Sequence, residues 1–483
     1  MMKTTLLSLA MLLGLSACAQ ENCDCPASFQ WMQETFEAND AGFAYGIDVK
    51  GKQAYDLHTA SIRERVARVK EDAACAELLN EWLLFFRSGH IGLQYNGSGT
   101  TTSEESGGKE SKDAIRAKFA DWEKMDFDVE AFKSYLDTKT TVDFEGIWES
   151  GVYQIGIQKV EDTYMGFIIE ADGVYWVPGQ IKLRINSSEA VYYMQDHSPE
   201  TFEKAELIGD TYLVMGFIDL NRTYPEIPTD PTLARYIKTM SSEKPFFEQL
   251  DDETTYLRIP SFGRESKKFI DKVIKKNEKA IKESEHLIID IRGNGGGSDV
   301  SYDELLPFMY TQPIRTVGVE FYSTPKNNQR MLDFINNPEF EFTDEEKEWA
   351  QTAYDKLAAR EGEFVNLDST VVDIFELEEV LPQPSKIAIM INGDNGSTAE
   401  QFLLAAKQSH KVKLYGTKTY GVLDISNMYW ADSPCGKYQL YYSLSRSMRI
   451  PDMAIDEFGI QPDYFIDRSV PAHKWLEFVQ ERL

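Results

Sequence analysis

Histidine, cysteine and positive charge are all scarce in this chain of 483 residues. It has six histidines, five cysteines, and 50 Lys and Arg against 79 Asp and Glu, so its net charge is -29 at pH 7. A chain this acidic repels phosphate backbones and anionic lipid surfaces, and we expect no nucleic-acid partner. Five cysteines do not make a disulfide framework at this length, and their spacing does not reveal which of them pair. Cys23 and Cys25 also lack the spacing and partners of a zinc site.

Long hydrophobic runs are missing too. No segment reaches ~18 uninterrupted apolar residues, so we expect no transmembrane helix. The apolar run from Leu6 to Leu15 is too short to span a bilayer and has the form of a signal peptide. It ends in Leu-Ser-Ala-Cys at positions 15–18, which resembles a bacterial lipobox. The alternative is cleavage at the A-x-A-like residues 17–19, which would give a free soluble protein.

With the lipobox, residues 1–17 are a lipoprotein signal peptide and Cys18 is the lipid-attachment residue. We therefore expect an exported bacterial lipoprotein, periplasmic or at the cell surface. Its contact with the membrane would be made through the lipidated N-terminus only. The remaining composition, 42% hydrophobic and 12% aromatic, suits a folded protein of two or three domains.

Hydrophobic periodicity divides the chain into three regions. Residues 23–140 have apolar residues at helical spacing and are predicted to form a helical N-terminal region. Residues 141–228 alternate with period two and predict a small antiparallel β-rich barrel or sandwich, with core aromatics at Trp148, Tyr153, Trp176 and Tyr192. Residues 245–470 show strand, helix, strand order, which predicts a parallel sheet, interrupted by a helical insertion at 326–384. The fold class is α/β.

The segment 387–406 is the strongest candidate for a site. An apolar strand (IAIMI, 387–391) runs through a glycine turn into a helix, so that Ser397 falls at the helix N-terminus. Unpaired amides there favour negative charge, and the serine could be a nucleophile. The alternative is structural, because Ser397-x-x-Glu400 also has the pattern of a capping box.

A second glycine cluster, at 293–297, follows another buried strand. It lacks the x-x-G of a dinucleotide fingerprint, and the chain has no Gly-Lys-Ser/Thr, so phosphate binding is the weaker interpretation. Such a loop can instead turn backbone N–H groups toward an oxyanion. The predicted donors are Gly295 or Gly296, together with Thr398.

A serine nucleophile needs a base, and His90 is the best placed of the six histidines. It lies between Gly89 and Ile91-Gly92, where a helix is predicted to end and a strand to begin, and a backbone corner can aim a side chain. A purely structural role for His90 remains open at this point.

Four blocks in order resemble the signature of the tail-specific and tricorn-like serine peptidases, the C-terminal processing peptidase superfamily. They are LIIDIRGNGGG (287–297), GSTAE (396–400), GTKTYG (416–421) and GIQPD (459–463). The resemblance covers about residues 250–468, with Ser88-Gly89-His90 as an outlying match. It implies a crotonase-like core for the domain at 245–470, and the β-rich region stands where the family's PDZ domain is usual.

The resemblance also indicates which base to expect. The family's Ser-Lys members carry a lysine directly after the third block, where this chain has Val422, so it resembles the tricorn-like Ser-His branch. In that branch Ser397 attacks the peptide carbonyl and His90 takes its proton. The residue that orients the imidazole would be Asp456, Glu457 or the Ser88 hydroxyl.

The expected activity is that of a lipid-anchored serine endopeptidase that cleaves polypeptides through an acyl-enzyme, without metal or cofactor. The alternative is a non-catalytic binding protein on the same scaffold, in which Ser397 is only a helix cap.

Overall fold

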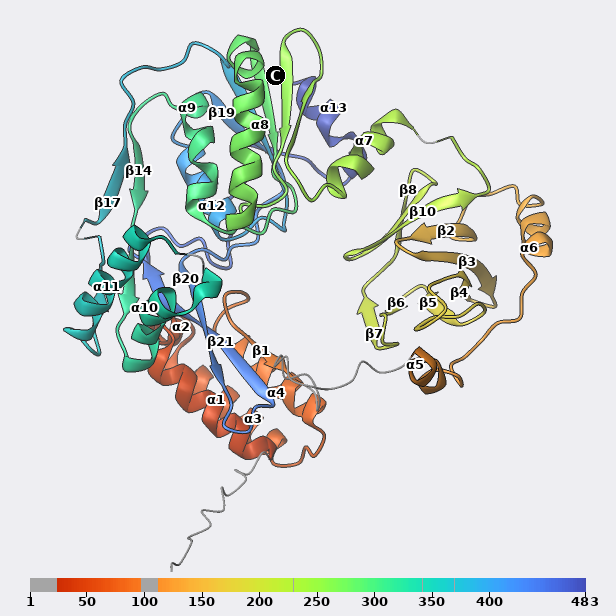
Figure 1. Cartoon of the computed structure of the whole chain (residues 1–483), viewed down its shortest axis with the longest axis horizontal. Coiled ribbons are helices and arrows are strands. Elements are labelled where there is room, and N and C mark those ends of the chain that lie inside the picture. The colour runs from red at the N-terminus through yellow and green to blue at the C-terminus, as the bar shows by residue number, and fades with distance from the viewer. Residues whose placement is uncertain (1–23, 97–111, 229, 341, 369) are drawn as a thin grey trace, which may run out of the picture.

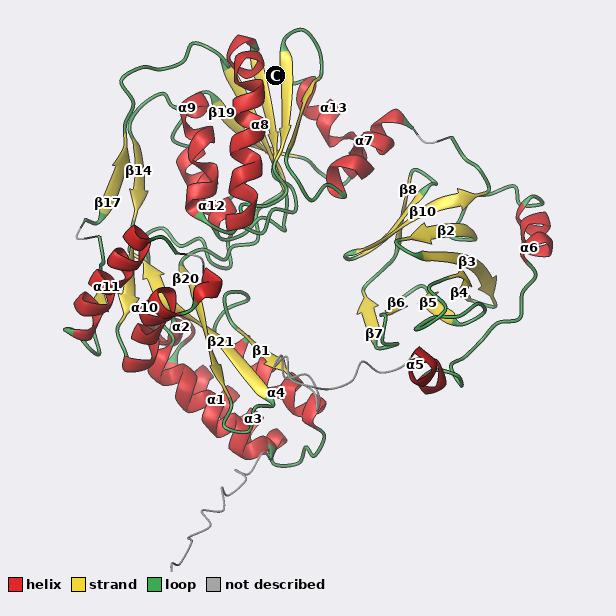
Figure 2. Cartoon of the chain, in the orientation of Figure 1, coloured by secondary structure: helices red, strands yellow, loops and turns green. Residues whose placement is uncertain are grey.

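The computed structural model of the chain describes residues 24–96, 112–228, 230–340, 342–368 and 370–483. The signal peptide expected at 1–17, Cys18 and Cys23 lie outside the described residues. Figures 1 and 2 show an α/β protein, in which one β-rich part stands apart from the remainder. None of the helices in these ranges is long and apolar enough to cross a membrane.

Four helices form the first part. They are α1 (Cys25–Asn39), α2 (Phe43–Lys50), α3 (Lys52–Val66) and α4 (Asp72–Leu83), followed by strand β1 (Gly92–Tyr95). Their apolar faces meet around Phe36 and Trp82, which have no exposed surface. A disulfide joins Cys25 to Cys75, a pairing that the spacing had left open.

The helical core is completed by strands from the far end of the chain. β20 (Ile425–Asp432) and β21 (Tyr438–Ser447) form a hairpin, and β1 pairs with β21. Side chains of this hairpin are buried in the same cluster as those of α1 and α4. Figure 1 shows these early helices beside the late strands. This packing brings the segment that carries His90 to the C-terminal half of the chain.

The β-rich part is one continuous nine-stranded antiparallel sheet in the order β7-β6-β5-β4-β3-β2-β10-β9-β8. Trp148, Trp176 and Tyr192 are buried in its core and Tyr153 packs against it, as predicted. Phe202 on end strand β7 contacts Phe217, next to β10, at 5.4 Å between ring centroids, so the sheet curls back on itself. The elements of this part are α5 (Lys112–Lys118), α6 (Val129–Leu136), β2 (Gly146–Ser150), β3 (Tyr153–Val160), β4 (Thr163–Glu170), β5 (Ile181–Ile185), β6 (Ala190–Tyr193), β7 (Pro199–Phe202), β8 (Glu206–Ile208), β9 (Tyr212–Met215) and β10 (Ile218–Tyr224).

The third part is built on a six-stranded sheet in the order β11-β12-β13-β18-β19-β22. All its pairings except β11 with β12 are parallel, as the strand, helix, strand order predicted. The strands are β11 (Phe246–Gln249), β12 (Thr254–Arg258), β13 (His286–Asp290), β18 (Lys386–Ile391), β19 (Val412–Gly416) and β22 (Tyr464–Phe465).

Helices cover both faces of this sheet. In β12, β13 and β18, odd-numbered residues such as Ile289 and Ile389 pack with α8 (Arg264–Glu283), η1 (Asp299–Leu305), α9 (Leu306–Met309) and α12 (Thr398–Ala406). Even-numbered residues such as Ile288 and Ala388 pack with α13 (Trp475–Gln480) on the other face. Because both faces are buried, the middle residues of β13 and β18 form continuous apolar runs. The loops at their carboxyl ends contain both glycine clusters.

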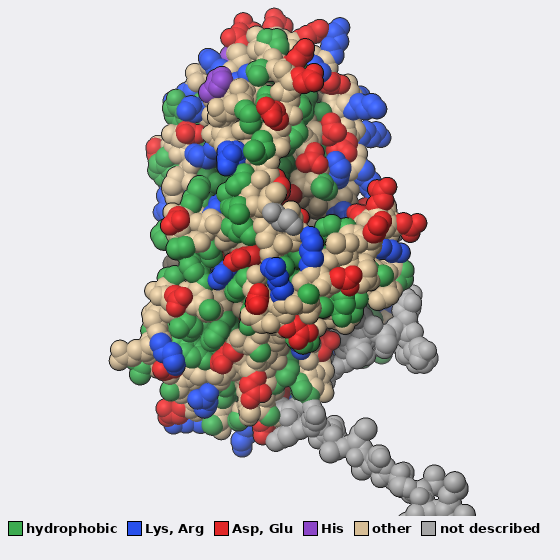
Figure 3. Space-filling model, turned by 90° about the vertical axis from the view of Figure 1, so that its left-hand side faces the viewer, with side chains coloured by type: hydrophobic (Ala, Val, Ile, Leu, Met, Phe, Trp, Pro, Cys, Tyr) green, Lys and Arg blue, Asp and Glu red, His purple; other side chains and the backbone are tan. Residues whose placement is uncertain are grey.

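The segment after α9 leads from the six-stranded sheet to the sheet of β20 and β21, because its residues 319–321 pair with β21. Its elements are β14 (Ile314–Val317), β15 (Val319–Tyr322), α10 (Pro325–Asn336), η2 (Pro338–Phe340), α11 (Asp344–Ala358), β16 (Phe364–Val365) and β17 (Val372–Phe375). The insertion expected to be helical therefore also holds two short strands. α7 (Pro231–Met240) and η3 (Ala472–Lys474) complete the described elements. Figure 3 shows acidic, basic and hydrophobic side chains interspersed on one face of the molecule, so the excess negative charge is not gathered there.

Candidate active site

Ser397 occupies a strained turn between β18 and α12. Its backbone angles are φ 55° and ψ -126°, a combination that costs a residue other than glycine about 1–3 kcal/mol. A sharp, strained strand-to-helix turn is also where α/β-hydrolases expose their nucleophilic serine. The Ser397 side chain makes no capping hydrogen bond, so the capping-box interpretation is wrong. The structure leaves the hydroxyl half-buried and not used by the helix.

Glu400, the other half of the supposed box, supports the loop after β19 instead. Its carboxylate has no exposed surface and accepts hydrogen bonds from the backbone amides of Gly421 and Val422, each at 2.9 Å. Burial raises the pKa of this carboxyl, while these hydrogen bonds oppose the rise. The Val422 carbonyl in turn accepts a hydrogen bond from the Ser397 amide at 3.1 Å. Glu400 therefore fixes the backbone against which the Ser397 turn rests.

The glycine loop after β13 lies directly against Ser397. Gly296 has φ +109°, and a Cβ there would be 2.8 Å from the Ser397 Cβ and 2.9 Å from the Thr398 nitrogen. Such distances exclude any side chain at this position. The sequence predicted that this loop and the Ser397 turn meet, and in the structure the two are in steric contact.

The amides of this loop differ in what they bind. The Gly296 amide, one of the predicted oxyanion donors, donates to the Asn294 Oδ1 at 3.0 Å and is already used. For the amides of Gly295, Gly297 and Thr398, the described part of the chain offers no hydrogen-bond partner. Gly297 had not been predicted. Only the folded loop shows which of the three consecutive glycine amides already has a hydrogen-bond partner.

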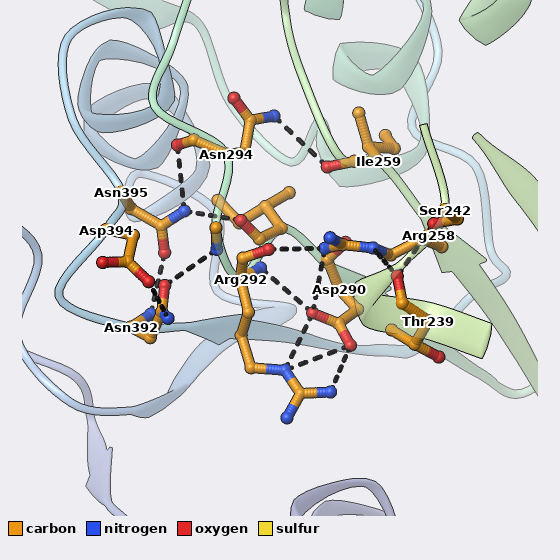
Figure 4. Close-up of polar contacts among 12 residues, drawn as sticks. Thr239, Ser242, Arg258, Ile259, Asp290, Arg292, Asn294, Asn392, Asp394 and Asn395 are labelled. Carbon is orange, nitrogen blue, oxygen red and sulfur yellow. Dashed lines mark hydrogen bonds and ion pairs between the residues drawn. The ribbon is translucent and has the colours of Figure 1, made fainter. Parts of the chain in front are cut away.

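Two asparagines lock the two loops together, as Figure 4 shows. The Asn395 side chain donates through Nδ2 to the backbone carbonyls of Ile291, at 2.5 Å, and Asn294, at 3.1 Å. The Asn294 side chain donates through Nδ2 to the Ile259 carbonyl at 3.2 Å. Both asparagines are fully buried. Each lies within a glycine cluster that the sequence had identified, but their roles as ties between strands were not predicted.

A buried ionic network lies beneath the glycine loop (Figure 4). Arg292 donates to both carboxylate oxygens of Asp290, with Nε 3.0 Å from Oδ1 and Nη2 2.6 Å from Oδ2. Arg258 donates to the Arg292 carbonyl at 2.7 Å. Although burial opposes it, the two guanidinium groups lower the pKa of Asp290. The carboxylate therefore stays charged and holds the backbone where the loop begins.

His90 lies in the loop between α4 and β1, with φ 51°. Its Nδ1 is 2.8 Å from the Ile425 carbonyl oxygen. Because a carbonyl can only accept, Nδ1 carries the proton and the Nε2 lone pair is left to act as a base. Burial lowers the pKa of His90 and the nearby Arg87 lowers it further, while the hydrogen bond to Ile425 opposes them. The imidazole is therefore neutral at neutral pH.

The backbone of His90 is held as firmly as its ring. Arg87 forms a two-pronged ion pair with Asp40, at 2.8 and 2.6 Å, and both side chains are buried. The same guanidinium donates to the carbonyls of Gly89, at 3.1 Å, and His90, at 2.9 Å. The Ser443 hydroxyl also donates to the His90 carbonyl, at 2.8 Å. Sequence reasoning missed this arrangement, because Asp40, Arg87 and Ser443 are far apart in the chain.

Val422 lies between the two candidate residues. A Cβ on Gly89 would be 2.3 Å from the Val422 Cγ1, and one on Gly396 would be 2.7 Å from its Cγ2. The glycines that immediately precede His90 and Ser397 thus pack on the same side chain. Within the described residues, no hydrogen bond joins His90 to Ser397. The fold therefore brings His90 and Ser397 close to Val422 without a hydrogen bond between the two.

Of the three predicted orienting groups, Asp456 and Glu457 contact backbone amides, and among the described residues none of the three is hydrogen-bonded to the imidazole. Asp456 accepts the amides of Leu423, at 2.6 Å, and Asp424, at 2.7 Å, in the segment that leads to the Ile425 carbonyl. Burial, and then the neighbouring Asp424, raise the pKa of Asp456 to about 6. Glu457 accepts the Ser88 amide at 2.9 Å. The ring itself is held by the Ile425 carbonyl, a backbone atom that no motif would identify.

Part of the chain resembles a known family. Residues 253–466 match the family model of peptidase family S41. No curated protein matches the chain. The structure of mature CPAF complexed with lactacystin is similar at a TM-score of 0.51 and 12% identity, over 95% of this chain and 97% of that one.

Two further structures align at lower TM-scores and add nothing to the assignment. The photosystem II D1 C-terminal processing protease aligns at 0.38 and 11% identity, over 93% of this chain and 95% of its own. The tricorn protease aligns at 0.41 and 13% identity, over 94% of this chain and 35% of its own. The region 253–466 is therefore that of a peptidase of family S41, of the tail-specific and C-terminal processing type, and it indicates that the chain is a serine peptidase.

Proposed function

We propose that this serine peptidase is an exported, lipid-anchored endopeptidase in which Ser397 is the nucleophile and His90 the general base. The conformation of Ser397 is the observation that carries the proposal. Its strained turn leaves the hydroxyl out of helix capping and packs against the glycine loop, where the amides of Gly295 and Gly297, like that of Thr398, have no partner among the described residues. A serine that served only the helix would need neither the strain nor the open amides.

The mechanism follows from these groups. His90 Nε2 accepts the proton of the Ser397 hydroxyl as Oγ attacks a peptide carbonyl. The amides of Thr398 and of Gly295 or Gly297 donate to the tetrahedral oxyanion. The imidazolium then gives its proton to the leaving amine, and an acyl-enzyme remains. Water, deprotonated by His90, hydrolyses the ester and restores Ser397.

The choice of His90 is supported by the residue that replaces the lysine of the Ser-Lys branch. Val422 occupies that place, is 8% exposed and packs between the two glycines described above. No cationic side chain can act from that position. Asp456 and Glu457 are proposed as positioning residues, because both act on the backbone near His90.

The proposed catalytic domain, with a crotonase-like core, is 245–470, and the helical region 23–140 contributes the base. Lipid on Cys18 would tether the enzyme to a bacterial envelope membrane, where its substrates are exported polypeptides. Metabolic labelling with an alkyne fatty acid tests the anchor. Label is expected on the wild-type chain and not on Cys18→Ser, and equal labelling of both would contradict the anchor.

The catalytic proposal is tested with a fluorophosphonate probe and a peptide pool. Wild type is expected to label and cleave, whereas Ser397→Ala and His90→Ala should do neither. His410→Ala is the matched control, because His410 is exposed near a helix end and should leave both activities intact. Cleavage that survives in His90→Ala would mean that another group is the base. No labelling of wild type would contradict the nucleophile.

A further inference from the structure

A cavity of about 140 Å³ lies against the segments that hold His90. Its walls come from α2, from the segment before His90, from the first residue of β20 and from the loop 454–458. The apolar side chains among them are Val49, Phe86, Ile425, Ala454 and Phe458. Val49 and Phe458 are 64% and 66% exposed, so apolar surface remains uncovered beside the cavity. The mechanism above gives none of these apolar side chains a role.

The size of the cavity suggests what it would hold. A cavity of about 150 Å³ lined by Leu, Ile and Phe in another protein binds one benzene molecule. One aromatic ring therefore matches the volume and the apolar walls of this cavity. The Tyr45 hydroxyl is near Asp424 and Asp456, which, after burial, raise its pKa. It remains a neutral hydrogen-bond donor for a polar group beside the ring.

The surroundings of the cavity favour a polypeptide over a free aromatic molecule. A second hollow of about 570 Å³ shares Tyr45 and Val49 with the cavity and continues along α2. It has room for the polypeptide residues that precede or follow the aromatic residue in the cavity. Its Glu320 and Arg446 pair with each other, whereas Asp48 has no ion-pair partner in the described part of the chain. A basic residue next to the aromatic one would therefore face Asp48.

Residues that line the cavity also hold His90 and the segment before it in place. Arg87 donates to the His90 carbonyl, the Ile425 carbonyl accepts from the His90 ring, and Glu457 accepts the Ser88 amide. All three residues line the cavity. A ring packed against them would restrict the movements that displace His90.

We propose that this cavity is an exosite that binds an aromatic side chain of a polypeptide, flanked by a basic residue, and that its occupation favours the reactive position of His90. The effect on His90 rests on the proposed function, but the binding does not.

Binding is measured on the full chain carrying Ser397→Ala, so that no probe is cleaved. The probes are the amides of N-acetyl-phenylalanyl-lysine, N-acetyl-phenylalanyl-glutamate and N-acetyl-alanyl-lysine, followed by ligand-observed NMR. The phenylalanyl-lysine amide should bind most tightly and the alanyl-lysine amide should not bind. Equal binding of the phenylalanyl and alanyl probes would overturn the exosite. Equal binding of the two phenylalanyl probes would overturn the basic flank.

Two variants locate the binding. Ala454→Phe fills the cavity and should abolish the phenyl signal. Val49→Ser removes an exposed apolar wall on α2 without disturbing a core, and should weaken binding. Val152→Ser is its control, because Val152 is 68% exposed in a turn of the β-rich part and should bind as wild type does. Unchanged binding in Val49→Ser, or loss in the control, would overturn the location.

Coupling is measured as the rate of fluorophosphonate labelling in the wild-type chain. Saturating phenylalanyl-lysine amide should raise it by about fivefold, the lower end of ordinary coupling between two sites. Binding with an unchanged rate would refute the coupling and leave the exosite. Binding to a chain that never labels would refute the proposed function alone.

Discussion

The strain at Ser397 predicts an unusual stability series. Replacement of Ser397 by glycine should relieve about 1–3 kcal/mol of backbone strain, from which about 0.5–1 kcal/mol is lost to the greater freedom of glycine in the unfolded chain. The folded state of Ser397→Gly should thus gain about 1 kcal/mol over wild type. Ser397→Ala keeps the strain and removes no capping bond, so its stability should stay close to that of wild type.

Hydrogen exchange of the buried strand β18 is a suitable assay, because it reports the local opening free energy in a protein of several domains. A gain of about 1 kcal/mol corresponds to exchange about fivefold slower. Both variants should also lose fluorophosphonate labelling.

Lys276, exposed on α8 over the same sheet, supplies the control. There Lys276→Gly should exchange faster than Lys276→Ala, because glycine in a helix interior costs about 1 kcal/mol. A helix cap at Ser397 would give a different order, with wild type most stable, glycine lower by a few tenths and alanine lower by about 1 kcal/mol. That order would refute the strain reasoning.

Four further predictions concern the base and its supports. The labelling rate should rise with pH as His90 loses its proton, with a midpoint below 6.5 because burial lowers its pKa; a midpoint above 6.5 would contradict this. Gly296→Ala should slow labelling by about 100-fold or more, because its Cβ would displace Ser397 and the oxyanion amides. Asp456 has a pKa raised to about 6, so the folded state binds its proton more tightly and the stability it confers falls as pH rises from about 4 to 6; Asp456→Asn should remove that slope from urea midpoints. Arg87→Lys loses the two-pronged bond to Asp40 and should slow labelling while leaving KM for peptide cleavage nearly unchanged, and a change confined to KM would contradict its positioning role.

The sequence by itself determined the local structure around the nucleophile. The apolar run 387–391, the glycine turn and the helical spacing after Ser397 predicted β18 and α12, and the order of elements predicted the parallel sheet. These features depend on near neighbours in the chain, where periodicity and turn chemistry act. The capping pattern at Ser397 and Glu400 was misleading for the same reason. It is a local pattern, and Glu400 instead makes contacts with residues about twenty positions away.

Only the tertiary structure decided how His90 is held and which loop amides are free. The His90 ring is bound by a backbone carbonyl 335 residues away, and every residue type has such a carbonyl, so no motif could identify it. Gly295, Gly296 and Gly297 are identical in sequence, and only the position of the Asn294 side chain makes the Gly296 amide differ from the other two. Residue types therefore fixed the candidates for chemistry, while long-range packing against Val422 and the Asp40-Arg87 pair set their geometry.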